Sequence, residues 1–130
     1  MPFRIGHLQI DSLIFRDAGK TREGEYFFYI VEEMPKFQGE MPEMFAEWIA
    51  DHLQYPKKAE RKKISGKVYI EFIVNPDGEV TGAKVVRGIN PILDAEALRV
   101  VESSPNWEPG KQRGRNVPVL FTFPINFVLN

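Results

Sequence analysis

The chain has 130 residues, a formal net charge of −1 and no cysteine. This length suits one domain with a core large enough to fold unaided, and the lack of cysteine excludes a disulfide scaffold, a thiolate zinc site and a cysteine nucleophile. The near-neutral charge gives no overall reason to expect nucleic acid as a partner. The longest apolar run, 26–31, is too short to cross a bilayer, so we expect the chain itself to be soluble.

The first half of the chain predicts an extended region followed by a helix. Residues 1–25 hold short apolar patches between turn-forming residues, which indicates one or two short strands or an extended arm. The β-forming stretch 25–33 is also expected to be extended. An amphipathic helix follows, with Pro42 at its first position and its end at Tyr55-Pro56. The apolar stripe of this helix consists of Met41, Met44, Phe45, Trp48, Ile49, His52 and Leu53.

The middle of the chain predicts a β-hairpin and a second helix. After a short basic helical piece, the stretch 66–74 alternates between apolar and polar residues, and the turn sequence "NPDG" joins it to a returning strand over 79–88. A helix follows, for which Asp94 is the expected cap and Pro105 the end. Leu93, Ala97, Leu98 and Val101 form its expected buried stripe.

The last strand, 117–128, alternates cleanly but contains two prolines. Residues of equal parity direct their backbone N–H groups to the same neighbour, and Pro118 and Pro124 are both even. Proline is tolerated in a sheet where no ladder bond is lost, so the even side is expected to be free. A right-handed crossover places this strand beside 66–74, in the order 2-1-3, as a sheet edge. Such an edge favours recognition of a peptide by strand addition.

Catalytic and metal chemistry have little support in this sequence. His7 and His52 stand alone, without cysteine or clustered acids at ligand spacing. Asp77 and Glu79 are explained by the hairpin turn, Ser12 and the other serines lie in no nucleophile motif, and no phosphate-binding glycine loop is present. We therefore predict no catalytic, cofactor or metal site.

Two basic stretches and one tryptophan have a structural and a functional interpretation each. The runs 57–63 and 111–115 are typical of solvated surfaces rather than of a nucleic-acid or membrane site. Either run would give a weak steering field toward anionic peptidoglycan or an acidic receptor segment. For Trp107 we favour packing in the core over contact with a partner.

Several segments together resemble one known family. They are "VEEMPKFQG" (31–39), Tyr55-Pro56, "GKVYIEFIVNPDGEV" (66–80), "KVVRGINPILDAEALRVV" (84–101), "WEPGKQRG" (107–114) and "VPVLFTFPINF" (117–127). In this order and spacing they resemble the C-terminal domain of TonB-type energy transducers, in the form common in Bacteroidetes. The resemblance covers 28–130 and leaves 1–27 as an N-terminal arm outside it.

The resemblance implies an α+β, two-layer sandwich with a three-stranded antiparallel sheet and two helices on one face. It implies a non-enzymatic domain in the periplasm that pairs its edge strand with the TonB box of an outer-membrane receptor. It also implies coupling to a proton-driven motor of the inner membrane through an anchor in the parent protein. The partner-binding residues carried over by position are Gln54, Val119, Leu120, Phe121, Thr122, Phe123, Pro124, Ile125, Asn126 and Phe127.

Some features depart from the family or leave alternatives open. Full transducers carry an N-terminal anchor and usually a proline-rich spacer, which we expect in a longer parent, and the family's usual Pro-Gly-Gly appears here as Gln38-Gly39-Glu40. The alternative function is a cell-wall-interaction or sensor module, appended to a membrane protein such as a peptidase and binding through its basic surface. Free in solution, the domain is expected to be a monomer or a strand-swapped dimer.

Overall fold

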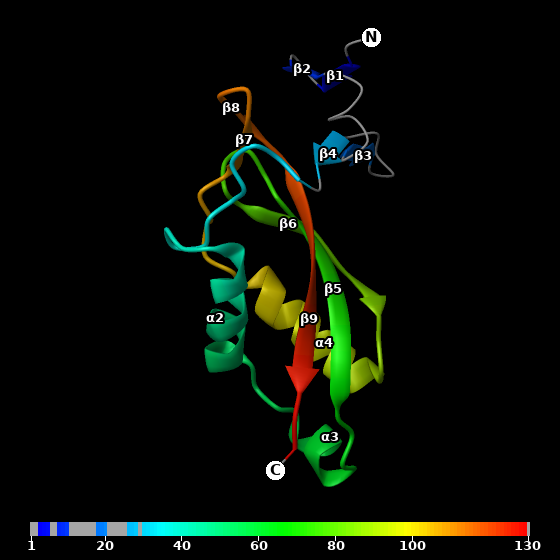
Figure 1. The fold of residues 1–130 in the computed structure, drawn as a ribbon. Helices are drawn as coiled ribbons and strands as arrows, with labels where there is room; N and C mark the ends of the chain where they lie inside the picture. Colours follow the sequence, from blue (N-terminus) through cyan, green and yellow to red (C-terminus); the bar gives the residue numbers. More distant parts are fainter. Residues whose placement is uncertain (1–2, 6–7, 11–17, 21–25, 29, 130) are drawn as a thin grey trace.

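The structure, a computed structural model, describes residues 3–5, 8–10, 18–20, 26–28 and 30–129. Figure 1 shows long strands at the centre and helices against one face of their sheet. The strands are β1 (Phe3–Ile5), β2 (Leu8–Ile10), β3 (Ala18–Lys20), β4 (Tyr26–Phe28), β5 (Gly66–Val74), β6 (Val80–Arg87), β7 (Gly110–Gln112), β8 (Arg115–Val117) and β9 (Val119–Phe127). The helical elements are the 3-10 turn η1 (Pro42–Met44) and the α-helices α2 (Phe45–His52), α3 (Lys57–Arg61) and α4 (Pro91–Glu102).

The hairpin β5–β6 forms where the sequence predicts it. Along β5, every second side chain is fully buried, as expected for a strand with one face on the core. In the turn, the Gly78 N–H donates to the Asn75 carbonyl at 2.8 Å, and the Glu79 N–H donates to Asp77 Oδ1 at 2.9 Å. These bonds are the turn chemistry that the "NPDG" sequence favours, so the predicted hairpin is confirmed.

The strand order 2-1-3 is also confirmed, because β5 lies between β6 and β9 and is antiparallel to both. The sheet is larger than predicted, however. It has five strands in the order β3-β4-β9-β5-β6, with β4 parallel to β9 at the single pair Phe28–Val119. The N-terminal region therefore contributes two short strands to the sheet that carries β9.

Both main helices pack on the same face of the sheet. Phe45 and Ile49 of α2, and Leu93 and Ala97 of α4, belong to one buried cluster together with the inward side chains of β5. The predicted stripe of the first helix is wrong at its start, since Met41 and Met44 are 65% and 38% exposed. These two residues precede α2, which begins only at Phe45 after the 3-10 turn. His52 is exposed at the other end of the helix.

The predicted cap of the second helix is wrong. The helix α4 starts at Pro91, and the side chain of Asn90 is the cap, with Oδ1 accepting from the Ile92 N–H at 2.9 Å. Asp94 lies inside the first turn, where its Oδ1 accepts from the Ile89 N–H at 3.0 Å. An asparagine directly before a proline at the first helical position is a common start signal.

The segment before β9 forms a second hairpin that the sequence analysis missed. The strands β7 and β8 pair through a two-residue turn at Arg113 and Gly114, both with positive φ, which is typical of a type I′ hairpin. The predicted strand 117–128 is therefore shorter in the structure, because Val117 belongs to β8 and Pro118 separates it from β9.

Trp107 lies in the core, as predicted, and is 4% exposed. The backbone N–H of Trp107 donates to the Gly78 carbonyl at 2.8 Å, and this bond holds the segment before β7 against the β5–β6 turn. Gly78 has φ +87°, and a Cβ there would lie 2.0 Å from the Trp107 carbonyl oxygen. Only glycine fits this close backbone approach. In the part of the chain that the structure describes, no helix is both long and apolar enough to cross a membrane.

Candidate peptide-binding edge

The strand β9 is paired along its whole length on one side. All nine of its residues lie opposite residues of β5, from Val119 opposite Val74 to Phe127 opposite Gly66. We call this the inner side of β9, and the side away from β5 its outer side. The continuous register on the inner side makes β9 an integral part of the sheet.

The outer side carries the backbone groups of the even residues. The Phe28 N–H, from β4, donates to the Pro118 carbonyl at 2.9 Å, so the backbone of residue 118 faces away from β5. Because alternate residues of an extended strand face opposite sides, Thr122, Pro124 and Asn126 also present their backbone groups outward. Pro124 lies opposite Tyr69 and has no N–H to donate. Pro124 therefore lies at a position where the hydrogen bonds between β9 and β5 need no N–H donor.

Most of the outer side has no partner strand among the described residues. The strand β4 reaches β9 only at Val119, and residues 120–127 pair with β5 alone. Between Thr122 and Asn126, the outer side offers two N–H donors and three carbonyl acceptors. The side chains of Thr122, Pro124 and Asn126 are exposed, while those of Phe121 and Phe123 are half-buried toward the helices. Leu120 is an exception among the even residues, at 7% exposed.

The C-terminal end of β9 meets the connection between α2 and α3. The Tyr55 ring packs edge-on against the Phe127 ring, with centroids 5.6 Å apart, and the Tyr55 hydroxyl donates to the Ile64 carbonyl. Burial raises the pKa of Tyr55, and the nearby Glu60 carboxylate raises it further, so the hydroxyl stays protonated and able to donate. Figure 1 shows this connection passing beside the end of β9.

An ion pair between the buried Glu96 and the exposed Arg99 holds the segment around Gln54 against α4. Glu96 is 9% exposed, and its Oε2 accepts from the Gln54 N–H at 2.6 Å. The Arg99 guanidinium donates to both oxygens of Glu96, at 2.6 and 2.7 Å, and to the His52 carbonyl at 3.2 Å. Burial alone raises the pKa of the Glu96 carboxyl, but the hydrogen bonds from Arg99 and Gln54 outweigh it and lower the pKa below its ordinary value.

The structure brings the ten predicted site residues together only in part. Nine of them are β9 itself, and Gln54 is exposed at the end where Tyr55 contacts Phe127. The Glu96–Arg99 pair, which positions Gln54, was not predicted from the sequence. Its only sequence signal is the i, i+3 spacing of opposite charges, which also describes an ordinary surface pair. His7 and Ser12 lie outside the described residues.

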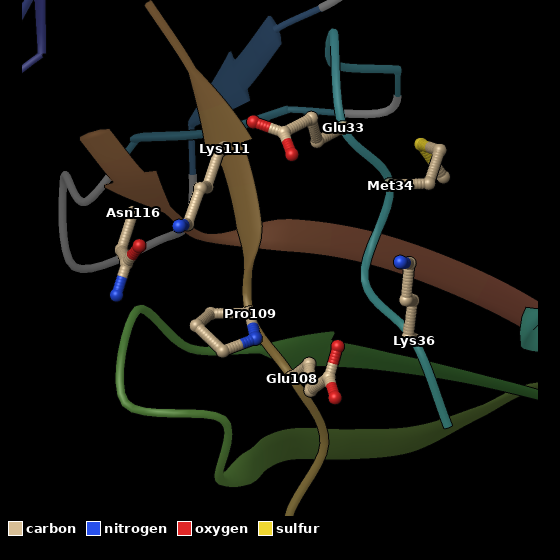
Figure 2. Close-up of a pocket in the computed structure, with 7 residues that line it drawn as sticks. All are labelled: Glu33, Met34, Lys36, Glu108, Pro109, Lys111 and Asn116. Atoms are coloured by element: carbon tan, nitrogen blue, oxygen red, sulfur yellow. The ribbon is translucent and has the colours of Figure 1, made fainter. Parts of the chain in front are cut away.

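A separate open pocket of about 320 Å³ lies near the β7–β8 hairpin. Figure 2 shows side chains of both charge signs around it. Two backbone bridges, Glu33–Lys111 and Lys36–Glu108, build its walls. Its lining residues are Glu33, Met34, Lys36, Glu108, Pro109, Lys111 and Asn116, none of them a predicted site residue. Within the described ranges, no group of three histidine, aspartate or glutamate side chains is placed to hold a metal ion.

The geometry defines a small α+β domain whose last strand is fully paired with β5 on one side and, among the described residues, has no partner strand along most of its other side. The family model described as Gram-negative bacterial TonB protein C-terminal matches residues 51–129. This match covers more than half of the chain, and the chain belongs to this family. The resemblance found in the sequence is thereby confirmed, whereas the domain boundary at residue 28 stays a prediction.

Individual relatives agree with the family match. The proteins named Protein TonB from two strains of Helicobacter pylori are each 37% identical to the chain over 62 residues, which is 47% of this chain and 22% of each relative. The match thus spans about a fifth of the length of these relatives. The NMR solution structure of the H. pylori TonB C-terminal domain is similar with a TM-score of 0.52 and 29% identity, covering 66% of this chain and 90% of that one.

Proposed function

We propose that this chain is the receptor-binding domain of a TonB-type energy transducer. In this proposal it binds a short extended segment of an outer-membrane receptor, the TonB box, along the outer side of β9. Its role is binding and force transmission without enzyme chemistry. The observation that carries the proposal is the open stretch from Thr122 to Asn126, on the outer side of β9, in a domain of the TonB C-terminal family.

Strand addition suits the groups that this stretch presents. A ligand strand would take the N–H groups of Thr122 and Asn126 and the carbonyls of residues 122, 124 and 126 into a ladder, which supplies affinity independent of side chains. The exposed side chains of Thr122, Asn126 and Gln54 would adjust sequence preference. The Glu96–Arg99 pair supports this role because it fixes the backbone beside Gln54.

The cellular setting follows from the family. We place the domain in the periplasm, in a parent protein whose anchor joins it to a proton-driven motor complex of the inner membrane. Pairing with the TonB box would then couple that motor to uptake through an outer-membrane transporter. The basic-surface alternative receives no support from the family match, which points to transduction.

An NMR titration of the full chain with a peptide copying the TonB box of a receptor from the same genome tests this proposal. We expect the largest amide shifts in residues 120–127, with smaller ones at Gln54. The pocket residues Glu33, Lys36 and Lys111 serve as an internal control, because none of them belongs to β9 or to the segment around Gln54. Shifts confined to that pocket, or to the face of α2, would overturn the proposal.

A further inference from the structure

A dense group of basic side chains surrounds α3. The stretch from Lys57 to Lys67 holds six basic residues and one carboxylate, a formal charge of +5, while the whole chain carries −1. All six basic side chains are exposed. Among the described residues, none of the six takes part in an ion pair. We call this group the α3 basic cluster; its members are Lys57, Lys58, Arg61, Lys62, Lys63 and Lys67.

The α3 basic cluster lies at the C-terminal end of β9. Lys67 stands directly opposite Asn126 in the β5–β9 register, so the two side chains are cross-strand neighbours on the same face. At the other end of the cluster, Lys57 follows within two residues of Tyr55, whose ring packs against Phe127. The Tyr55–Ile64 hydrogen bond closes the intervening loop. Figure 1 shows α3 near the end of β9.

The N-terminal end of β9 has a different electrostatic environment. There the exposed Lys36 and Lys111 share one pocket with Glu33 and Glu108, so the charges balance (Figure 2). The strand β9 itself contains no charged residue. A ligand lying along its outer side therefore meets a larger excess of positive charge at the C-terminal end, where the α3 basic cluster lies, than beside this pocket.

We propose that the peptide strand paired with the outer side of β9 carries acidic residues just beyond its paired segment, and that the α3 basic cluster binds them. The acidic residues of the ligand lie just beyond Phe127, at the C-terminal end of β9. Because a strand advances by about 3.3 Å per residue, the two to four ligand residues next to the last pair pass the cluster. This inference rests on the proposed strand pairing and adds a sequence requirement to it. Charges at the rim of an interface act mainly through specificity and association rate.

Three synthetic peptides test the inference by NMR titration of the labelled full chain. The first is a Thr-Val-Thr-Val-Thr strand followed by three aspartates, the second has the aspartates before the strand, and the third has asparagines on both sides. We expect one aspartate peptide to bind about 5- to 10-fold more tightly than the asparagine peptide at about 50 mM salt. This advantage should fall below about 2-fold at roughly 500 mM salt, where charges are screened within a few ångströms.

The same measurement gives the direction of pairing. If the peptide with aspartates after the strand binds more tightly, the ligand is parallel to β9, as β4 is. If the peptide with aspartates before the strand binds more tightly, the ligand is antiparallel. Equal affinity of all three peptides, with shifts in β9, would overturn the inference and leave strand pairing intact. Absence of β9 shifts with every peptide would overturn strand pairing and the inference together.

Charge-reversal variants assign the effect to the cluster. The double variant Lys57→Glu, Lys58→Glu should abolish the aspartate advantage. The matched control Lys111→Glu, Arg115→Glu makes the same charge change in the β7–β8 hairpin and should preserve it. A peptide of three aspartates without the strand tests whether the cluster binds anions in the absence of strand pairing. The inference fails if this peptide shifts α3 with the affinity of the full peptide, and it fails equally if the double variant keeps the aspartate preference.

Discussion

The two sides of β9 share one backbone but differ in nearly every other respect. The inner side forms nine consecutive pairs with β5, and its odd side chains lie in the aromatic core. The outer side forms one pair with β4, at Val119, and its polar side chains meet solvent. One strand can therefore hold the fold through the backbone groups of its odd residues and leave those of its even residues accessible. Substitutions at neighbouring positions should therefore separate stability from binding.

The largest expected contrast is between proline substitutions at two adjacent residues. Phe123→Pro removes an inward N–H and a ring that packs 5.5 Å from Phe45 and 5.7 Å from Phe72. We expect it to cost at least about 3 kcal/mol of unfolding free energy in urea titrations. Thr122→Pro removes only an outward donor and should cost less than about 1 kcal/mol, yet weaken TonB-box peptide binding about 10-fold or more. Similar losses of stability in both variants would mean that the even residues do not direct their backbone groups away from β5.

Among the described residues, β4 covers the outer side of β9 at its N-terminal end. Phe28 is fully buried against Val31, Val117 and Val119 in a cluster apart from the main core. Phe28→Ala should lower the local opening free energy by about 2–4 kcal/mol, visible as faster exchange of the residue 28 amide. Exchange of Ile70 in β5 should remain unchanged. The control is Ile30→Ala, at a side chain that is 62% exposed.

If the Ile70 amide exchanges faster by the same factor in Phe28→Ala, β4 and the main sheet open as one unit. The contrast between the two sides would then hold for binding but not for local stability.

The Glu96 carboxylate holds the backbone at Gln54 in place. Glu96→Gln leaves Arg99 without its carboxylate and should cost about 1–3 kcal/mol at neutral pH, whereas Glu102→Gln, exposed on the same helix, should cost little. The folded-state pKa of Glu96 lies below its ordinary value of 4.5. The contribution is therefore complete above that value and is lost as the pH falls through the lowered pKa. Urea titrations at neutral and acid pH should show the two proteins converging; a constant difference would contradict the assignment.

The smallest effect is expected on the open face of the sheet. Lys84 Nζ lies 3.5 Å from Glu71 Oε1, and the lysine side chain is 59% exposed. An ion pair so accessible to water contributes little, so Lys84→Ala should change the unfolding free energy by less than about 0.5 kcal/mol. It should leave peptide binding unchanged, because Glu71 lies on the inner neighbour β5. A loss above 1 kcal/mol in thermal or urea unfolding would be at odds with this view.

Much of the fold was predictable because its signals are local. The alternation of β5 and the "NPDG" turn specify the hairpin within a dozen residues, and the equal parity of Pro118 and Pro124 indicates which side of β9 is free. The start of α4 could also have been predicted, because Asn90-Pro91 is a stronger helix-start signal than Asp94. The β7–β8 hairpin was missed although Arg113-Gly114 is an acceptable turn pair. There the basic residues suggested a loop.

The remaining features depend on contacts between distant residues. The Phe28–Val119 pair joins residues about ninety positions apart, and nothing in the local sequence near Phe28 selects that partner. The burial of Glu96 was equally hidden, because a glutamate three residues before an arginine is typical of exposed helix surfaces. Met41 and Met44 fit the helical period but precede the first helical turn that touches the sheet. Periodicity alone does not show where packing begins.

Pro124 also affects how well two copies of β9 would pair with each other. Two β9 strands that pair antiparallel through their outer sides about a two-fold axis each bring the same proline to the junction. A symmetric ladder therefore lacks two donors in a stretch of only a few residues, while a ligand strand without proline lacks one. Unpaired carbonyls of this kind make self-association costlier than association with a foreign strand. A single residue on the outer side thus disfavours pairing of this strand with its own copy.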